Sequence, residues 1–130
     1  LYPGTKDMLC KLKKACIRIA VGSSSKNARM ILENAGILDL FNFVSDGNGL
    51  CRSKPDPEVF LKAASGLNVD NAECIVVEDA EAGLIAAKRA GMTAYGVGFE
   101  NPSGVADMYF EKTPDILSAI IEDMVLGDNK

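Results

Sequence analysis

The chain has 130 residues, of which 48% are hydrophobic and 25% charged, and its formal net charge at pH 7 is −4. This size and composition indicate one globular domain with a core of its own and exclude a disordered chain. No apolar run approaches the roughly 20 residues of a membrane span, and the acidic charge is unsuited to binding polyanions. We therefore expect neither nucleic acid nor a membrane as a partner.

The sequence contains no histidine, which excludes Ser-His-Asp and Cys-His nucleophile pairs and histidine-ligated metal sites. Any chemistry must use carboxylates, lysines, hydroxyl groups and a hard metal ion. The four cysteines form no Cys-x-x-Cys pair and are interpreted as structural free thiols, two of them in apolar stretches where burial is expected: Cys10, Cys16, Cys51 and Cys74. Nothing resembles a signal peptide, so the expected location is cytoplasmic.

Helical and strand patterns alternate along the chain, which is typical of an α/β fold. In chain order, the patterns predict a helix at 5–15, a strand at 17–21, a helix at 26–35, a strand at 43–45 and a helix at 57–67. They continue with a strand at 74–77, a helix at 80–90, strands at 93–97 and 108–110, and a helix at 113–124. Continuous apolar runs of this kind suit parallel strands that are buried on both faces.

Several helix ends carry recognisable signals. Asp56 is a candidate N-cap with Pro57 at the first helical position, and Thr113 with Pro114 repeats that pattern. Gly91 follows the helix at 80–90, as a glycine at the position after a helix should. We interpret the apolar stripes of these helices as core and not as partner-binding surfaces.

In a parallel α/β sheet, ligands bind at the carboxyl ends of the strands. After the first predicted strand, three serines lead into a helix: Ser23, Ser24 and Ser25. Hydroxyl groups and the free N–H groups of a helix start favour an anion such as phosphate. The spacing does not match a Walker loop. The alternative interpretation is that Ser24 or Ser25 only caps the helix.

Two further polar segments follow strands. A glycine loop, Asp46-Gly47-Asn48-Gly49, comes after the second strand and leads to Lys54, which lies before a proline-started helix. Lys54 is therefore either a presented cation or an ordinary surface lysine. Glu78 and Asp79 come directly after the third strand, where adjacent carboxylates favour a divalent cation such as magnesium or calcium. The alternative is that Asp79 only caps the next helix.

Three segments resemble, in order and spacing, motifs of the haloacid dehalogenase superfamily and its β-phosphoglucomutase-like branch. They are Gly22-Ser23-Ser24-Ser25-Lys26-Asn27, Ser53-Lys54-Pro55-Asp56-Pro57 and Glu78-Asp79-Ala80-Glu81-Ala82-Gly83. The resemblance runs from Leu1 to about Gly98. It implies a three-layer Rossmann-like core with a mostly parallel sheet and magnesium-dependent phosphotransfer on a small phosphorylated metabolite, most of all a sugar phosphate.

The resemblance also implies roles for single residues. The transferring phosphoryl group would be held by Ser23, the backbone at Ser24, and the catalytic Lys54, and magnesium would be held by Glu78 and Asp79. A second, non-transferring phosphate would contact Ser25, Lys26 and Asn27. Within this set, the pair Lys26 and Asn27 favours a mutase over a simple phosphatase.

The family's nucleophile motif, Asp-x-Asp, occurs nowhere in the sequence. In the family, the first aspartate attacks phosphorus and the second acts as general acid and base. The strand that carries them lies centrally, between the strands that end here at Val21 and Val77. We therefore expect residues 1–130 to be one partial core domain without a cap, part of a larger polypeptide or a cleavage product, and inactive alone.

The missing strand and cap would be supplied in cis or in trans. Two other interpretations stay open. The chain could be a non-catalytic phosphate-binding or metal-binding fragment, or pseudoenzyme, because the nucleophile is absent. A receiver-like phosphoacceptor is a weaker alternative, because no separate acceptor aspartate follows a strand.

Overall fold

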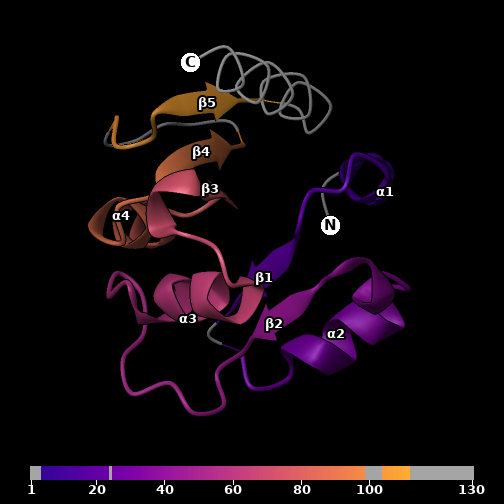
Figure 1. The fold of residues 1–130 in the computed structure, drawn as a ribbon. Helices are drawn as coiled ribbons and strands as arrows, with labels where there is room; N and C mark the ends of the chain where they lie inside the picture. The colour runs from indigo at the N-terminus through magenta and orange to yellow at the C-terminus, as the bar shows by residue number, and fades with distance from the viewer. Residues whose placement is uncertain (1–3, 24, 99–103, 112–130) are drawn as a thin grey trace.

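The computed structural model describes residues 4–23, 25–98 and 104–111. Helices and strands alternate through these residues (Figure 1). The helices are α1 (Thr5–Lys14), α2 (Ala28–Asn34), α3 (Glu58–Leu67) and α4 (Glu81–Arg89), with 3-10 turns η1 (Leu38–Leu40) and η2 (Asn71–Glu73). The strands are β1 (Ala20–Gly22), β2 (Phe43–Ser45), β3 (Ile75–Glu78), β4 (Thr93–Val97) and β5 (Met108–Phe110). The helix predicted at 113–124 lies outside the described residues.

All strand pairs among the described residues are parallel, which confirms the predicted α/β class. β1 pairs with β2, with Ala20 opposite Phe43. β4 lies between β3 and β5 in a second sheet, in which Val76 is opposite Ala94. The strands are short, and β1, β2 and β3 end next to polar residues, namely Ser23, Asp46 and Asp79.

β1 and β3 are not paired with one another; each is the last strand of its own sheet. A cavity of about 1000 Å³ lies between them and is lined by residues of both strands, including Val21, Gly22, Ile75 and Val77. Figure 1 shows the two sheets apart from one another, with α3 on the stretch of chain that runs from β2 to β3. β1 and β3 therefore each have an edge on the cavity that pairs with no other described strand.

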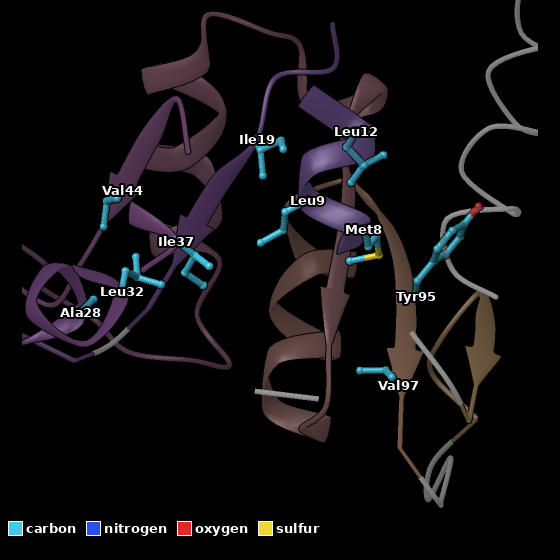
Figure 2. Close-up of a cluster of buried hydrophobic side chains, with 10 residues drawn as sticks. All are labelled: Met8, Leu9, Leu12, Ile19, Ala28, Leu32, Ile37, Val44, Tyr95 and Val97. Carbon is cyan, nitrogen blue, oxygen red and sulfur yellow. The ribbon is translucent and has the colours of Figure 1, made fainter. Parts of the chain in front are cut away.

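The core forms two clusters of buried side chains. The first joins α1 and α2 to strands of both sheets, and its members are Met8, Leu9, Leu12, Ile19, Ala28, Leu32, Ile37, Val44, Tyr95 and Val97 (Figure 2). The second joins α3 and α4 to β3 and β4 and includes Val59, Phe60 and Leu84. The predicted apolar stripes of these helices are thus core, as expected.

Element ends differ from the predictions by a few residues, and the hydrogen bonds show why. β1 begins at Ala20 and not at residue 17, because the N–H of Ile19 donates to the side-chain oxygen of Asn42, not to a backbone carbonyl. α3 begins at Glu58, one residue later than predicted, although the Asp56 carboxylate still accepts a hydrogen bond from the N–H of Glu58. The prediction that Gly91 follows α4 is confirmed by its positive φ of 76°.

The cysteines are free thiols, as expected, but the burial expected for two of them is wrong, because none of the four is fully buried. All four thiols are free, Cys16 and Cys51 are exposed, and Cys10 and Cys74 are only half-buried. Cys74 lies at the end of its sheet, just before β3, where the apolar run meets solvent. Among the described helices, none is long and apolar enough to cross a membrane.

Candidate functional site

Lys54 joins the carboxyl ends of β1 and β3, two strands that do not pair with one another. Its ammonium donates hydrogen bonds to the carbonyl oxygen of Gly22, the last residue of β1, at 3.2 Å and to Oε2 of Glu78, the last residue of β3, at 2.8 Å. The Lys54 and Glu78 side chains are only 19% and 12% exposed. The cation therefore lies at one mouth of the cavity between β1 and β3, largely shielded from water.

The aromatic ring of Phe60 supports this lysine from α3. The Lys54 ammonium lies 5.0 Å from the ring centroid, within the range of a cation–π interaction. Gly22 makes room for the ring, since a Cβ at that position would come within 2.8 Å of two ring carbons. A side chain at residue 22 would displace the Phe60 ring, and Lys54 would lose its contact with that ring.

Glu78 is held by the protein through both carboxylate oxygens. Oε2 accepts the hydrogen bond from Lys54, and Oε1 accepts the N–H of Asp79 at 3.2 Å. A Cβ at Gly83, in the first turn of α4, would overlap the Glu78 carboxylate. Gly83 therefore leaves the space in which this carboxylate lies.

Asp79 presents an exposed carboxylate beside Glu78 at the edge of the same cavity. Ala80, not Asp79, occupies the N-cap position of α4. Carboxylate oxygens are the donors that magnesium prefers, and each oxygen of Glu78 keeps a second lone pair beyond its hydrogen bond. The two side chains fit part of a magnesium shell. Across the described ranges, no group of three or more His, Cys, Asp or Glu side chains is close enough to hold a metal ion.

We call the segment after β1 that carries Ser23 and Ser25 and leads to Lys26 and Asn27 the serine loop. Two of its own hydroxyl groups order its backbone. Ser23 Oγ accepts the N–H of Ser25, and Ser25 Oγ accepts the N–H of Asn27, both at 3.1 Å. Ser24 lies outside the described residues. The alternative that Ser25 caps the helix is wrong, because Asn27 occupies the N-cap position of α2 and makes no side-chain cap hydrogen bond; the Ser25 hydroxyl instead accepts the N–H of Asn27. A serine hydroxyl that accepts such a bond still has its proton to donate to an anion.

The serine loop and Lys54 meet at the end of β1, because the lysine contacts Gly22 and the loop begins at the next residue. Lys26 and Asn27 are exposed farther along the same loop. The sequence predicted that the serine loop, Lys54, Glu78 and Asp79 follow strands. It did not predict that Phe60 supports Lys54 or that Gly83 leaves space for the Glu78 carboxylate. The apolar spacing of Phe60 indicated only core, and Gly83 stood out only as part of the third motif.

Comparison with known proteins adds independent evidence. Residues 1–97 match the family described as haloacid dehalogenase-like hydrolases. Over 123 residues the chain is 43% identical to the β-phosphoglucomutase of Bacillus subtilis, covering 95% of this chain and 54% of that relative. It is 35% identical over 128 residues to a phosphoglycolate phosphatase of Neisseria meningitidis, covering 97% of this chain and 52% of that protein.

A solved structure shows the same fold. The β-phosphoglucomutase of Clostridium difficile superposes with a TM-score of 0.88 at 36% identity, covering 95% of this chain and 55% of that one. The chain thus spans about half the length of the curated relatives it matches.

Proposed function

The chain belongs to the haloacid dehalogenase-like hydrolase family, and from this membership we propose that it supplies the phosphate-binding and metal-binding half of a magnesium-dependent phosphotransfer site. The curated relatives are phosphomutases and phosphatases that act on phosphorylated substrates. The proposed substrate is a small phosphorylated metabolite, most of all a sugar phosphate.

The contact of Lys54 with the ends of both β1 and β3 carries this proposal. Phosphoryl transfer depends mainly on positioning and on positive charge around the transferring oxygens. A shielded ammonium beside a serine loop supplies both. The proposed phosphoryl contacts are Ser23, the backbone at Ser24, and Lys54.

The nucleophile is proposed to come from a strand inserted between β1 and β3, in cis or in trans together with a cap. Within the described residues, each strand has an edge toward the cavity that pairs with no other strand, and one inserted parallel strand could pair with both edges. An aspartate at the carboxyl end of that strand would lie beside the Lys54 ammonium. The sequence has no Asp-x-Asp, so we expect no turnover from this chain alone.

Magnesium, when bound, supplies positive charge that stabilises the transferring phosphoryl oxygens. Asp79 would be its main ligand from this chain, because its carboxylate is exposed at the cavity edge. Glu78 would contribute through a lone pair left by its hydrogen bonds, while it continues to orient Lys54. Ser25, Lys26 and Asn27 are proposed to contact a second phosphate, which favours a mutase over a phosphatase.

Reconstitution tests this function. The chain is joined or mixed with a segment that supplies an Asp-x-Asp strand and a cap, and magnesium-dependent turnover of a phosphorylated hexose is measured. We expect turnover only in the assembled protein and its loss in Asp79→Ala. Asp70→Ala is the matched control, because Asp70 is an exposed aspartate before η2. Full activity of Asp79→Ala would contradict the metal assignment.

A second candidate is a non-catalytic module that binds phosphate or metal, favoured by the absence of Asp-x-Asp. It predicts phosphate binding by the chain alone and no turnover after assembly. The reconstitution therefore separates the two candidates, because the enzyme hypothesis requires turnover in the assembled protein.

A further inference from the structure

We propose that Asn48 is a positioning residue for the second-phosphate contacts of Ser25, Lys26 and Asn27. The inference rests on the proposed function and names a residue that none of the three motifs contains. Asn48 lies in the glycine loop after β2, and its side-chain amide donates a hydrogen bond to the carbonyl oxygen of Lys26 at 3.2 Å. It contacts the loop that would bind phosphate without belonging to it.

The hydrogen bonds fix one peptide plane of the serine loop from both ends. The carbonyl of Lys26 and the N–H of Asn27 belong to the same planar peptide unit. Asn48 binds that carbonyl, and Ser25 Oγ accepts that N–H at 3.1 Å. The preceding carbonyl, that of Ser25, accepts the N–H of Gly47 at 2.9 Å. The backbone that carries the Lys26 side chain is thus tied to the glycine loop twice in succession.

The Asn48 amide is itself held in place by its neighbours. The N–H of Asn48 donates to Asp46 Oδ1 at 2.9 Å, and the Asp46 side chain is only 15% exposed. On the other side, Lys62 of α3 donates to the carbonyl oxygen of Gly49 at 2.6 Å. Gly49 has a φ of 78°, which glycine adopts readily, so the turn needs no strained side chain. The amide therefore reaches the serine loop from an anchored turn although Asn48 is exposed.

This arrangement bears on affinity because Lys26 is an exposed lysine on a short loop. A flexible cation must be ordered when it binds phosphate, and that ordering reduces the affinity. Hydrogen bonds that hold the backbone at Lys26 and Asn27 before phosphate binds lower the entropic cost of ordering the lysine. Asn48 touches neither substrate nor reacting atoms in this account, so its effect would be confined to the ligand that uses the second phosphate.

Binding measurements on the full chain test the proposal without requiring turnover. The probes are inorganic phosphate and a hexose 1,6-bisphosphate, titrated by calorimetry. Asn48→Ala removes the donor, and Asn48→Leu removes it at similar size. Since a hydrogen bond contributes about 0.5–1.5 kcal/mol, both variants should bind the bisphosphate about three- to ten-fold more weakly. Inorganic phosphate affinity should stay within about twofold, because the Asn48–Lys26 hydrogen bond includes none of the groups proposed to bind the transferring phosphoryl group.

Two further sets of variants show whether Asn48 positions the phosphate contacts or only stabilises the fold. Asn71→Ala, at an exposed asparagine in η2, should change neither affinity. In a Lys26→Gln background, Asn48→Ala should have little further effect on bisphosphate binding, since the side chain it positions is gone. An equal loss in both backgrounds, or an equal loss for both ligands, would overturn the proposal.

The failures of the two proposals are distinguishable. If phosphate binds and depends on Lys54, but the bisphosphate binds no tighter than phosphate, the second-phosphate role of Asn48 is wrong and the proposed function stands. If the chain binds neither ligand, the Asn48 proposal is contradicted, and the proposed function is decided separately by turnover of the assembled protein.

Discussion

The Lys54 ammonium lies 2.8 Å from Oε2 of Glu78, although the two residues are 24 positions apart in the sequence. Glu78 ends β3, while the second acceptor of Lys54, the Gly22 carbonyl, ends β1 in the other sheet. A single side chain therefore connects the carboxyl ends of two strands that do not pair. The charge of this lysine is placed where an inserted strand would end.

Removing the lysine should destabilise the fold as well as the site. Lys54→Met leaves a mostly buried Glu78 carboxylate without its cation, and we expect a loss of about 1–3 kcal/mol in the free energy of unfolding. Urea unfolding measures this loss. The double variant Lys54→Met, Glu78→Gln should cost less than the sum of the single variants, because the two residues are in contact. Additive effects would mean that the pair is not coupled.

Gly22→Ala should disturb the support of Lys54. The new Cβ would come within 2.8 Å of the Phe60 ring, and crowding of this kind costs about 1–3 kcal/mol. Combining Gly22→Ala with Phe60→Leu should recover part of the phosphate affinity lost through displacement of the ring. Gly91→Ala serves as the comparison, because a Cβ added there would meet no atom within 4 Å beyond the adjacent backbone, and only its φ of 76° is unfavourable. It should lower stability and leave phosphate binding unchanged.

Asp107 should make the stability of the second sheet depend on acid. Burial acts to raise the pKa of Asp107, but the hydrogen bonds from the Ala94 N–H and from Lys88 outweigh it, so the pKa is lowered. A lowered folded-state pKa contributes stability that is present above the ordinary aspartate pKa and is lost as pH falls through the folded-state pKa. Wild type should exceed Asp107→Asn in thermal stability at pH 7, and the difference should shrink below about pH 4. A difference that does not change with pH would contradict this role.

Thiol reactivity should distinguish the cysteines. Burial, together with the nearby carboxylates of Glu73 and Asp70, raises the pKa of Cys74, which lowers its thiolate fraction. Cys16 and Cys51 are exposed. Alkylation with iodoacetamide at pH 8, followed by peptide mass spectrometry, should therefore modify Cys16 and Cys51 before Cys74. Preferential modification of Cys74 in the folded chain would contradict the assigned environment.

The strands and helices could be predicted from the sequence because apolar runs, prolines and glycines act locally. The predicted strands at 43–45, 93–97 and 108–110 match the observed bounds. The start of β1 could not be predicted, since it depends on the Asn42 side chain, 23 residues away, accepting the N–H of Ile19. The cysteines were placed too deep, because an apolar stretch near a sheet end does not bury every side chain.

In the site, too, local sequence patterns predicted which residues matter but not the contacts they make with residues distant in the sequence. The sequence placed Lys54 between a glycine loop and a helix, but its acceptors lie 24 and 32 residues away and are brought to it only by the fold. The support from Phe60 depends on the missing side chain at Gly22, a relationship between two elements that no local pattern contains. The roles assigned to the candidate site residues stay predictions, like the cytoplasmic location; these residues are Ser23, Ser24, Ser25, Lys26, Asn27, Lys54, Glu78 and Asp79.

The most direct test of the proposed half-site is the binding of the strand itself. A peptide with an apolar strand ending in Asp-x-Asp is titrated into the chain, beside a version in which asparagine replaces the first aspartate and a scrambled peptide. We predict that the first peptide binds more tightly than the other two, and that Lys54→Met abolishes its advantage over the asparagine version. Absence of binding, or an advantage that survives Lys54→Met, would contradict the account.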